Sequence, residues 1–173
     1  ENYVGSHLEN YDFLVILSHF KGHMMGGFGG AIKNMSVGIA SKKGKCLIHT
    51  AGENEKSMRG GIQNEFLESM AEAALSIADY QGENIIYINV MNNLSIDCDC
   101  DPHPAAPCME DIGILASMDP VALDQACVDL IYASEDGQPI ISRIEARNGI
   151  LTLEHSQNIG LGSRQYCLVS LDD

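Results

Sequence analysis

Short apolar runs that alternate with a helical segment are the strongest constraint on the fold of this chain. Residues 11–18 (YDFLVILS) and 84–91 (NIIYINVM) are rich in β-branched and aromatic residues, as strands buried on both faces are. Between them, over residues 64–80, apolar residues recur at helical spacing, and Gly82 stands where a helix would end. This order predicts an α/β fold with a mostly parallel sheet and helices on both faces.

The remaining segments complete that expectation. Asp119 and Pro120 predict the cap and first turn of a helix that runs to Tyr132, and Asp124 is then a charge on the helix surface, although either aspartate could instead reach a metal. No repeat or linker divides residues 1–173, so we expect one domain. Further predictions are a helix over 31–40 that is short or interrupted at Gly38, a turn at 42–45, extended chain at 46–49, strands at 111–117 and 166–171, and helices near 139–146 and 151–159.

The charge balance restricts the partners of this chain. Ten Lys and Arg residues stand against 24 Asp and Glu residues, a formal charge of −14, so the basic patch that duplex nucleic acid requires is not expected. The apolar stretches fall short of the roughly 20 residues of a membrane span, and no charged segment followed by an apolar one opens the sequence. We therefore expect a soluble, cytoplasmic protein that does not bind membranes.

The six cysteines fall into two groups. Cys46, Cys127 and Cys167 each occur singly in an apolar segment and are predicted to be small buried hydrophobic residues. The others, Cys98 and Cys100 with Cys108 behind them, share one polar loop over residues 92–110. Such spacing is typical of metal or redox chemistry in a reducing compartment more than of a disulfide-stapled secreted domain.

The loop after the first predicted strand carries one candidate site. Glycines, imidazoles and ammonium groups at the carboxyl end of a strand can together hold a metal or an anion. A glycine-rich turn with two surface histidines is the competing interpretation, and the pattern is neither a P-loop nor a dinucleotide fingerprint. The histidine at position 49 is a weaker candidate, since a lone histidine at a strand end is more often structural. The candidates are His19, Lys21, His23, Gly26, Gly27, Gly29, Gly30, Lys33, Asn34 and His49.

The second candidate site is the segment DCDCDPH, residues 97–103. Alternating thiolates and carboxylates suit zinc or iron, with His103 as a possible nitrogen ligand. Because a cubane cluster requires four cysteines, three cysteines favour a single ion or a redox thiol pair, and a 4Fe-4S cluster is not expected within this chain. The alternative is an acidic solvated loop whose cysteines are inert.

Three longer motifs carry a family resemblance. The segments SHFKGHMMGGFGGAIKNMSVGIASKKGKCLIH, CDCDPH and DIGILASMDPVALDQACVDLI resemble domain-of-unknown-function family 362, in its branch of uncharacterised Fe-S centre proteins, over residues 19–130. That branch carries a ferredoxin-like insert with two sets of closely spaced cysteines, yet residues 50–63 contain no cysteine. The resemblance thus implies that the chain corresponds to the C-terminal part of the family fold without the insert. Such a domain would be incomplete or completed by a partner, so we expect either a homodimer or a missing N-terminal half.

A shorter likeness adds nickel to the possible metals. HMMGGFGGAIKNMSVGIAS is similar to a segment of the nickel-pincer lactate racemase family, which implies a cationic position at Lys33. Our hypothesis is that Cys98 and Cys100, with one or two of His19, His23 and His103, bind one divalent ion, while Lys21 and Lys33 orient a small anionic ligand. The alternative is a non-catalytic electron-transfer or scaffold module that docks a ferredoxin. No catalytic residue is assigned.

Overall fold

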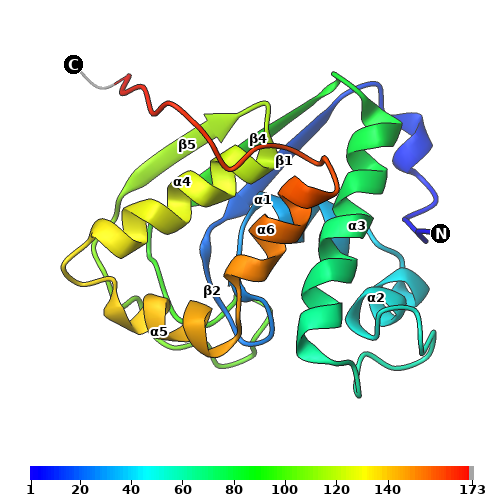
Figure 1. Cartoon of the computed structure of the whole chain (residues 1–173), viewed down its shortest axis with the longest axis horizontal. Helices are drawn as coiled ribbons and strands as arrows, with labels where there is room; N and C mark the ends of the chain where they lie inside the picture. Colours follow the sequence, from blue (N-terminus) through cyan, green and yellow to red (C-terminus); the bar gives the residue numbers. More distant parts are fainter. Residues whose placement is uncertain (172–173) are drawn as a thin grey trace.

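The computed structural model describes residues 1–171 and contains a three-stranded sheet, with strand order β1-β4-β5 (Figure 1). β1 (Leu14–His19) runs parallel to β4 (Ile85–Met91), as predicted. β5 (Gly113–Ser117) is antiparallel to β4, so the sheet is mixed. The loop over residues 92–112 returns the chain without a crossover helix, which permits only an antiparallel neighbour.

Helices account for most of the remaining chain, and a small hairpin follows β1. The hairpin pairs β2 (Lys21–His23) with β3 (Gly27–Gly29), where only a loop was predicted. The helices are the 3-10 turn η1 (Leu8–Asn10), α1 (Ala31–Lys33) with its π-helical continuation η2 (Asn34–Gly38), α2 (Lys42–His49), α3 (Gln63–Gln81), α4 (Pro120–Ala133), α5 (Gln138–Ala146) and α6 (Ile150–Asn158).

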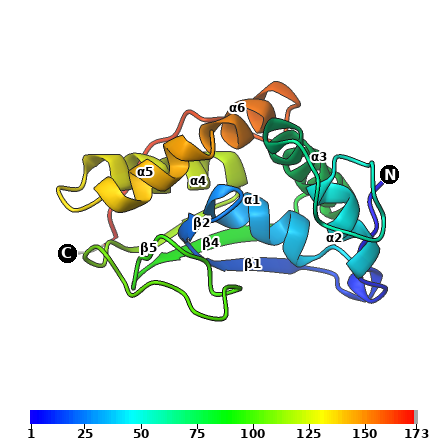
Figure 2. The ribbon, with the colours of Figure 1, turned by 90° about the horizontal axis from the view of Figure 1, so that it is seen from below.

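One face of the sheet carries the helices, which lie above it in Figure 2. Ile16 and Tyr87 point into the core on that side. Val15 and Leu17 flank Ile16 in β1 and are 56% and 60% exposed, and Ile114 in β5 is 69% exposed. The expectation of helices on both faces is therefore not met within residues 1–171. Because strand side chains alternate between the faces, the same strands that build the core leave an apolar surface on the other side.

Two of the helices begin or end where the sequence predicts. α3 stops at Gly82, whose φ of 60° places it in the left-handed region that favours glycine. α4 starts after Asp119, whose side chain accepts hydrogen bonds from the backbone N–H groups of Val121 and Ala122 at 2.8 and 3.0 Å. Within the described residues, no helix is both long and apolar enough to cross a membrane.

Two local predictions are wrong. Residues 42–49 form α2 in place of a turn and extended chain, because the side chain of Ser41 accepts from the N–H of Gly44 and caps the helix. Residues 166–171 form no strand, and Val169 is 69% exposed. The prediction that Cys167 is buried is also wrong, since this residue is exposed, whereas Cys46 and Cys127 are buried as predicted.

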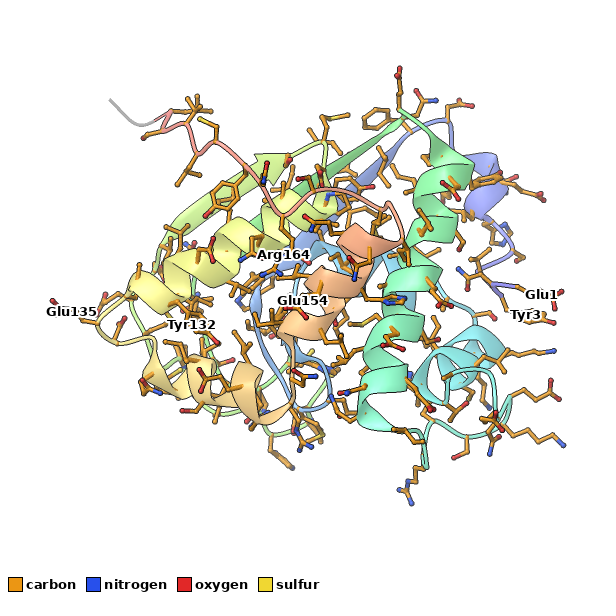
Figure 3. The ribbon with its side chains drawn as sticks, in the orientation of Figure 1. Glu1, Tyr3, Tyr132, Glu135, Glu154 and Arg164 are labelled. Carbon is orange, nitrogen blue, oxygen red and sulfur yellow. The ribbon has the colours of Figure 1, made fainter. Side chains whose placement is uncertain are left out.

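The segment after α6 is instead held against the helices. Arg164 donates from Nε to the side-chain oxygen of Gln125 at 2.7 Å, and its guanidinium lies 3.5 Å from the carboxylate of Glu154. Figure 3 shows Arg164 beside Glu154 where this segment crosses the helical layer. Tyr166 donates to Asp129 of α4, so side chains, and no sheet ladder, fix the start of this segment.

Candidate functional site

A cavity of about 810 Å³ lies where β1 ends, between the β2–β3 hairpin, α1 with η2, the end of α2 and the loop that follows β4. The hairpin and the loop are joined directly, since the N–H of Gly22 donates to the carbonyl of Ser95 at 2.8 Å. Gly22 leaves no room for a Cβ atom, which would overlap the backbone of Ile96. The sequence thus brings its two predicted sites together through a close backbone approach that only glycine allows.

Three side chains on the cavity wall form a group that could hold a metal. The ligand atoms of His23, Cys98 and Cys100 all lie within 4.8 Å of one another. His23 is buried in the hairpin, and the two thiols come from the loop after β4. Nζ of Lys33 lies 3.9 Å from Sγ of Cys98 and places a positive charge beside the thiols.

The protonation of this group follows from its surroundings. Burial, followed by the charges of Lys33, His49 and Arg143, lowers the pKa of His23 to about 3, so its ring is neutral at physiological pH. Burial, together with a hydrogen bond to Cys98, raises the pKa of the Cys100 thiol. The imidazole is therefore already neutral, the form that binds a metal, although one of its ring nitrogens must first be freed, whereas Cys100 must lose a proton to bind.

His19 and Lys21 form a separate network with Asp99. Nε2 of His19 lies 2.6 Å from the carbonyl oxygen of Asn92 and donates to it, and Nδ1 lies 2.6 Å from Nζ of Lys21. Lys21 is buried and pairs with the carboxylate of Asp99. Partial burial opposes ionisation of Asp99, but the hydrogen bond from Lys21, followed by the contact with His19, lowers its pKa overall. Both ring nitrogens of His19 thus have other partners, and His19 is not part of the potential metal site formed by His23, Cys98 and Cys100.

The cavity concentrates positive charge in an acidic protein. Four of the ten Lys and Arg residues line it, Lys21, Lys33, Lys45 and Arg59, against three aspartates at positions 97, 99 and 101. Its formal balance is therefore 4 − 3 = +1, whereas the whole chain carries −14. An anionic ligand is favoured here and repelled by most of the remaining surface.

His49, the weaker candidate in the sequence, also lines this cavity. It is the last residue of α2 and is 8% exposed. Nδ1 lies 2.6 Å from the carbonyl oxygen of Lys45, and the ring stacks on Phe66 with 4.8 Å between centroids. Burial is the main cause of its lowered pKa. Because residues 42–49 are helical, the side chain faces the cavity from a rigid element and not from a strand end.

Asp124 is the residue that the sequence interpretation misplaced. It is fully buried, and its carboxylate accepts from the N–H groups of Ala31 and Ile32 at 2.8 and 3.0 Å and from Asn89 at 2.7 Å. Burial raises its pKa to about 6 despite these bonds. Asp124 therefore already occupies the start of α1, where a free anion could otherwise have met backbone N–H groups. The apolar residues at positions 120, 121, 127 and 128, three and four places away on the same helix face, were the signal for its burial.

The other candidates divide between the cavity wall and structural positions. Gly29 and Gly30 line the cavity, and a Cβ atom on Gly30 would overlap the carboxylate of Asp124. Asn34 also reaches the wall, but its amide donates to the carbonyl of Leu17 at 2.9 Å and so ties η2 to β1. The cavity lining does not include Gly26, Gly27 or His103, and His103 is exposed.

A mixed α/β domain whose cavity carries thiol, imidazole and ammonium groups is the class of protein that the fold and the site define. A family model described as domain of unknown function (DUF362) matches residues 1–129 of the 173, a range that includes the hairpin and both cysteines of the metal-binding group. The chain belongs to this family. No curated protein and no solved structure matches it.

Proposed function

We propose that the protein binds one divalent metal ion through Cys98, Cys100 and His23, and holds a small anionic ligand beside it. The observation that carries the proposal is the convergence of two thiols and an imidazole within 4.8 Å on the wall of a cavity whose lining carries more cationic than anionic side chains. Lys33 would serve both the metal and the anionic ligand, since it lines the cavity and lies 3.9 Å from Sγ of Cys98.

The donor set fits a metal such as zinc, iron or nickel. Tetrahedral zinc with bonds of about 2.0–2.3 Å separates its ligand atoms by roughly 3.3–3.8 Å, so atoms that lie within 4.8 Å of one another need to close by about 1.5 Å at most. Cys98 and Cys100 are separated by one residue on a loop, where side-chain rotation can supply that movement. Three protein ligands leave a fourth position free, as catalytic sites do and structural sites do not. The two loop cysteines are too few for a cubane cluster.

The bound metal would supply Lewis-acid or redox chemistry at its open position. The chain contributes the surroundings. Lys33 and Lys45 supply positive charge for an anionic group, and the salt bridge from Arg143 to Asp97, at 3.2 Å, anchors the start of the thiol loop. The ion pair between the buried Lys21 and the exposed Asp99 holds the middle of the same loop.

The test is elemental analysis with an optical spectrum of anaerobically purified protein. We expect about one equivalent of zinc, iron or nickel per chain. The Cys98→Ser/Cys100→Ser double variant should lose it, whereas Cys108→Ser, a matched control on the same loop outside the group, should keep it. Wild-type protein that stays metal-free after reconstitution, or a double variant that retains the metal, would refute the proposal.

A second candidate function is an electron-transfer or scaffold module that docks a ferredoxin-like protein. The open sheet face favours it, because exposed apolar side chains on Val15, Leu17 and Ile114 indicate a surface for protein contact. Titration with a 4Fe-4S ferredoxin should then shift the resonances of these strands, and Leu17→Lys should abolish the shifts. Light scattering would separate this outcome from a homodimer that covers the same face.

A further inference from the structure

We infer that His49 is the hydrogen-bond acceptor that makes this cavity selective for an oxyanion bearing a proton, such as a hydrogen phosphate group. The inference rests on the proposed function, since it concerns the anion that binds beside the cluster of His23, Cys98 and Cys100. It assigns the ligand class and the residue that selects it. The metal is not required for the argument, because the evidence lies in the hydrogen bonds and charges of the anion side.

The tautomer of His49 follows from geometry. A carbonyl oxygen can only accept, so the 2.6 Å contact with Lys45 O places the ring proton on Nδ1. In the neutral ring, Nε2 then carries a free lone pair. The stack on Phe66, with ring planes 24° apart, holds the imidazole in this orientation. The side chain is 8% exposed and lines the cavity, and within residues 1–171 no group donates a hydrogen bond to Nε2.

The charge beside this acceptor is also available to a ligand. Within the described chain, Lys45 and Arg59 have no ion-pair partner, and the side chain of Lys33 contacts only the thiol of Cys98 among polar groups. Lys21 is occupied by Asp99, and Asp124 occupies the N-terminus of α1. A bound anion is therefore held by these three cations beside the uncharged acceptor Nε2 of His49. Two of the three aspartates that line the cavity, Asp97 and Asp99, are already in ion pairs.

An acceptor in a cationic cavity discriminates between anions. Sulfate and ionised carboxylates offer acceptors alone at neutral pH, so their oxygens would meet the lone pair of Nε2 without a proton between them. A hydrogen phosphate group keeps a P–OH that donates to Nε2, while its other oxygens accept from the lysines and the arginine. The low pKa of His49 agrees with this arrangement, because a protonated ring would donate and favour either anion.

The experiment measures the dissociation constants of inorganic phosphate and sulfate at pH 7 by calorimetry. Wild-type protein should bind phosphate about tenfold more tightly than sulfate, the ratio that one hydrogen bond supplies. The His49→Phe variant preserves an aromatic ring over Phe66. Its affinity for phosphate should fall to that for sulfate, so that the two anions bind equally. His49→Gln, whose amide oxygen can accept, should recover part of the preference, and His103→Phe, outside the cavity, should behave as wild type.

Equal binding of both anions by wild type, an unchanged ratio in His49→Phe, or binding of neither anion would overturn the inference. Thermal unfolding of each variant shows that lost binding is not lost structure, and the recovery in His49→Gln is a second check. Metal content is measured on the same samples. A selective but metal-free protein would refute the metal site alone, whereas a metal-loaded protein without the preference would refute the role of His49.

Discussion

The Nδ1 atom of His23 accepts a hydrogen bond from the backbone N–H of Gly26, 2.8 Å away in the turn of the hairpin. A neutral ring in this arrangement keeps its proton on Nε2. A metal bound at Nδ1 would use the same lone pair, and a metal bound at Nε2 would move the proton to Nδ1. In either case the ring can no longer accept from Gly26, so metal binding and this hydrogen bond exclude each other.

Metal binding should therefore release the Gly26 amide. In a titration of metal-free protein with zinc, we expect the Gly26 resonance to shift and its hydrogen exchange to accelerate, at a cost of about 1 kcal/mol for the lost bond. The Gly160 amide, which donates to the carbonyl of Gln157 far from the thiols, is the internal control. Binding of one equivalent with an unchanged Gly26 amide would remove His23 from the ligand set.

Acid should destabilise the metal-free protein through His23. Because the pKa of His23 is about 3 in the folded protein and 6.5 in the unfolded chain, the unfolded state binds more protons between these values. The free energy of unfolding should therefore rise with pH from 3 to 6.5, by at most about 1.4 kcal/mol per unit from this residue. Urea unfolding at pH 4, 5, 6 and 7 measures the slope. His23→Gln should flatten it, and a slope identical in the two proteins would contradict the assigned shift.

Asp124 should make the free energy of unfolding fall as pH rises, the opposite of the effect of His23. Its pKa is raised to about 6, above the unfolded value of 3.8, so the folded state binds more protons between these values, and the stability that it contributes falls as pH rises through this range. Asp124→Asn replaces one of the two carboxylate oxygens that accept from the buried Ala31 and Ile32 N–H groups with an amide nitrogen that cannot accept, and should cost about 2 kcal/mol. The cost should be smaller at pH 7 than at pH 4. Asp79→Asn, at an exposed helix position, should change stability little at either pH.

Gly30 should not tolerate a methyl group. The Cβ atom of Gly30→Ala would overlap the Asp124 carboxylate, so either the cap on α1 or the packing of α4 must shift, at a cost of about 1–3 kcal/mol. Gly5→Ala is the matched control, since its Cβ atom would lie at an ordinary 3.7 Å from the carbonyl of Ile39. Thermal unfolding of both variants measures the difference. Equal stability would show that the carboxylate is not held as close to Gly30 as described.

Local patterns sufficed for the elements that the sequence predicted correctly. The apolar runs of β1 and β4, the helical spacing of α3 and the cap at Asp119 each depend on neighbours within a few residues. The family also follows from continuous motifs. Cysteine spacing alone identified Cys98 and Cys100, because two thiols one residue apart are neighbours in any fold.

Contacts between residues far apart in the sequence decided the features that local patterns did not predict. The antiparallel direction of β5 is set by the path of its loop, and helix α2 packs its Gly44 against the carbonyl of the distant Tyr3. The choice of His23 as the histidine beside the thiols requires the hairpin to meet a loop some 75 residues later. The burial of Asp124 and the stacking of His49 on Phe66 are likewise set by partners across the fold. A sequence specifies donors and acceptors, but their pKa values and proton positions depend on burial and contacts that exist only once the chain has folded.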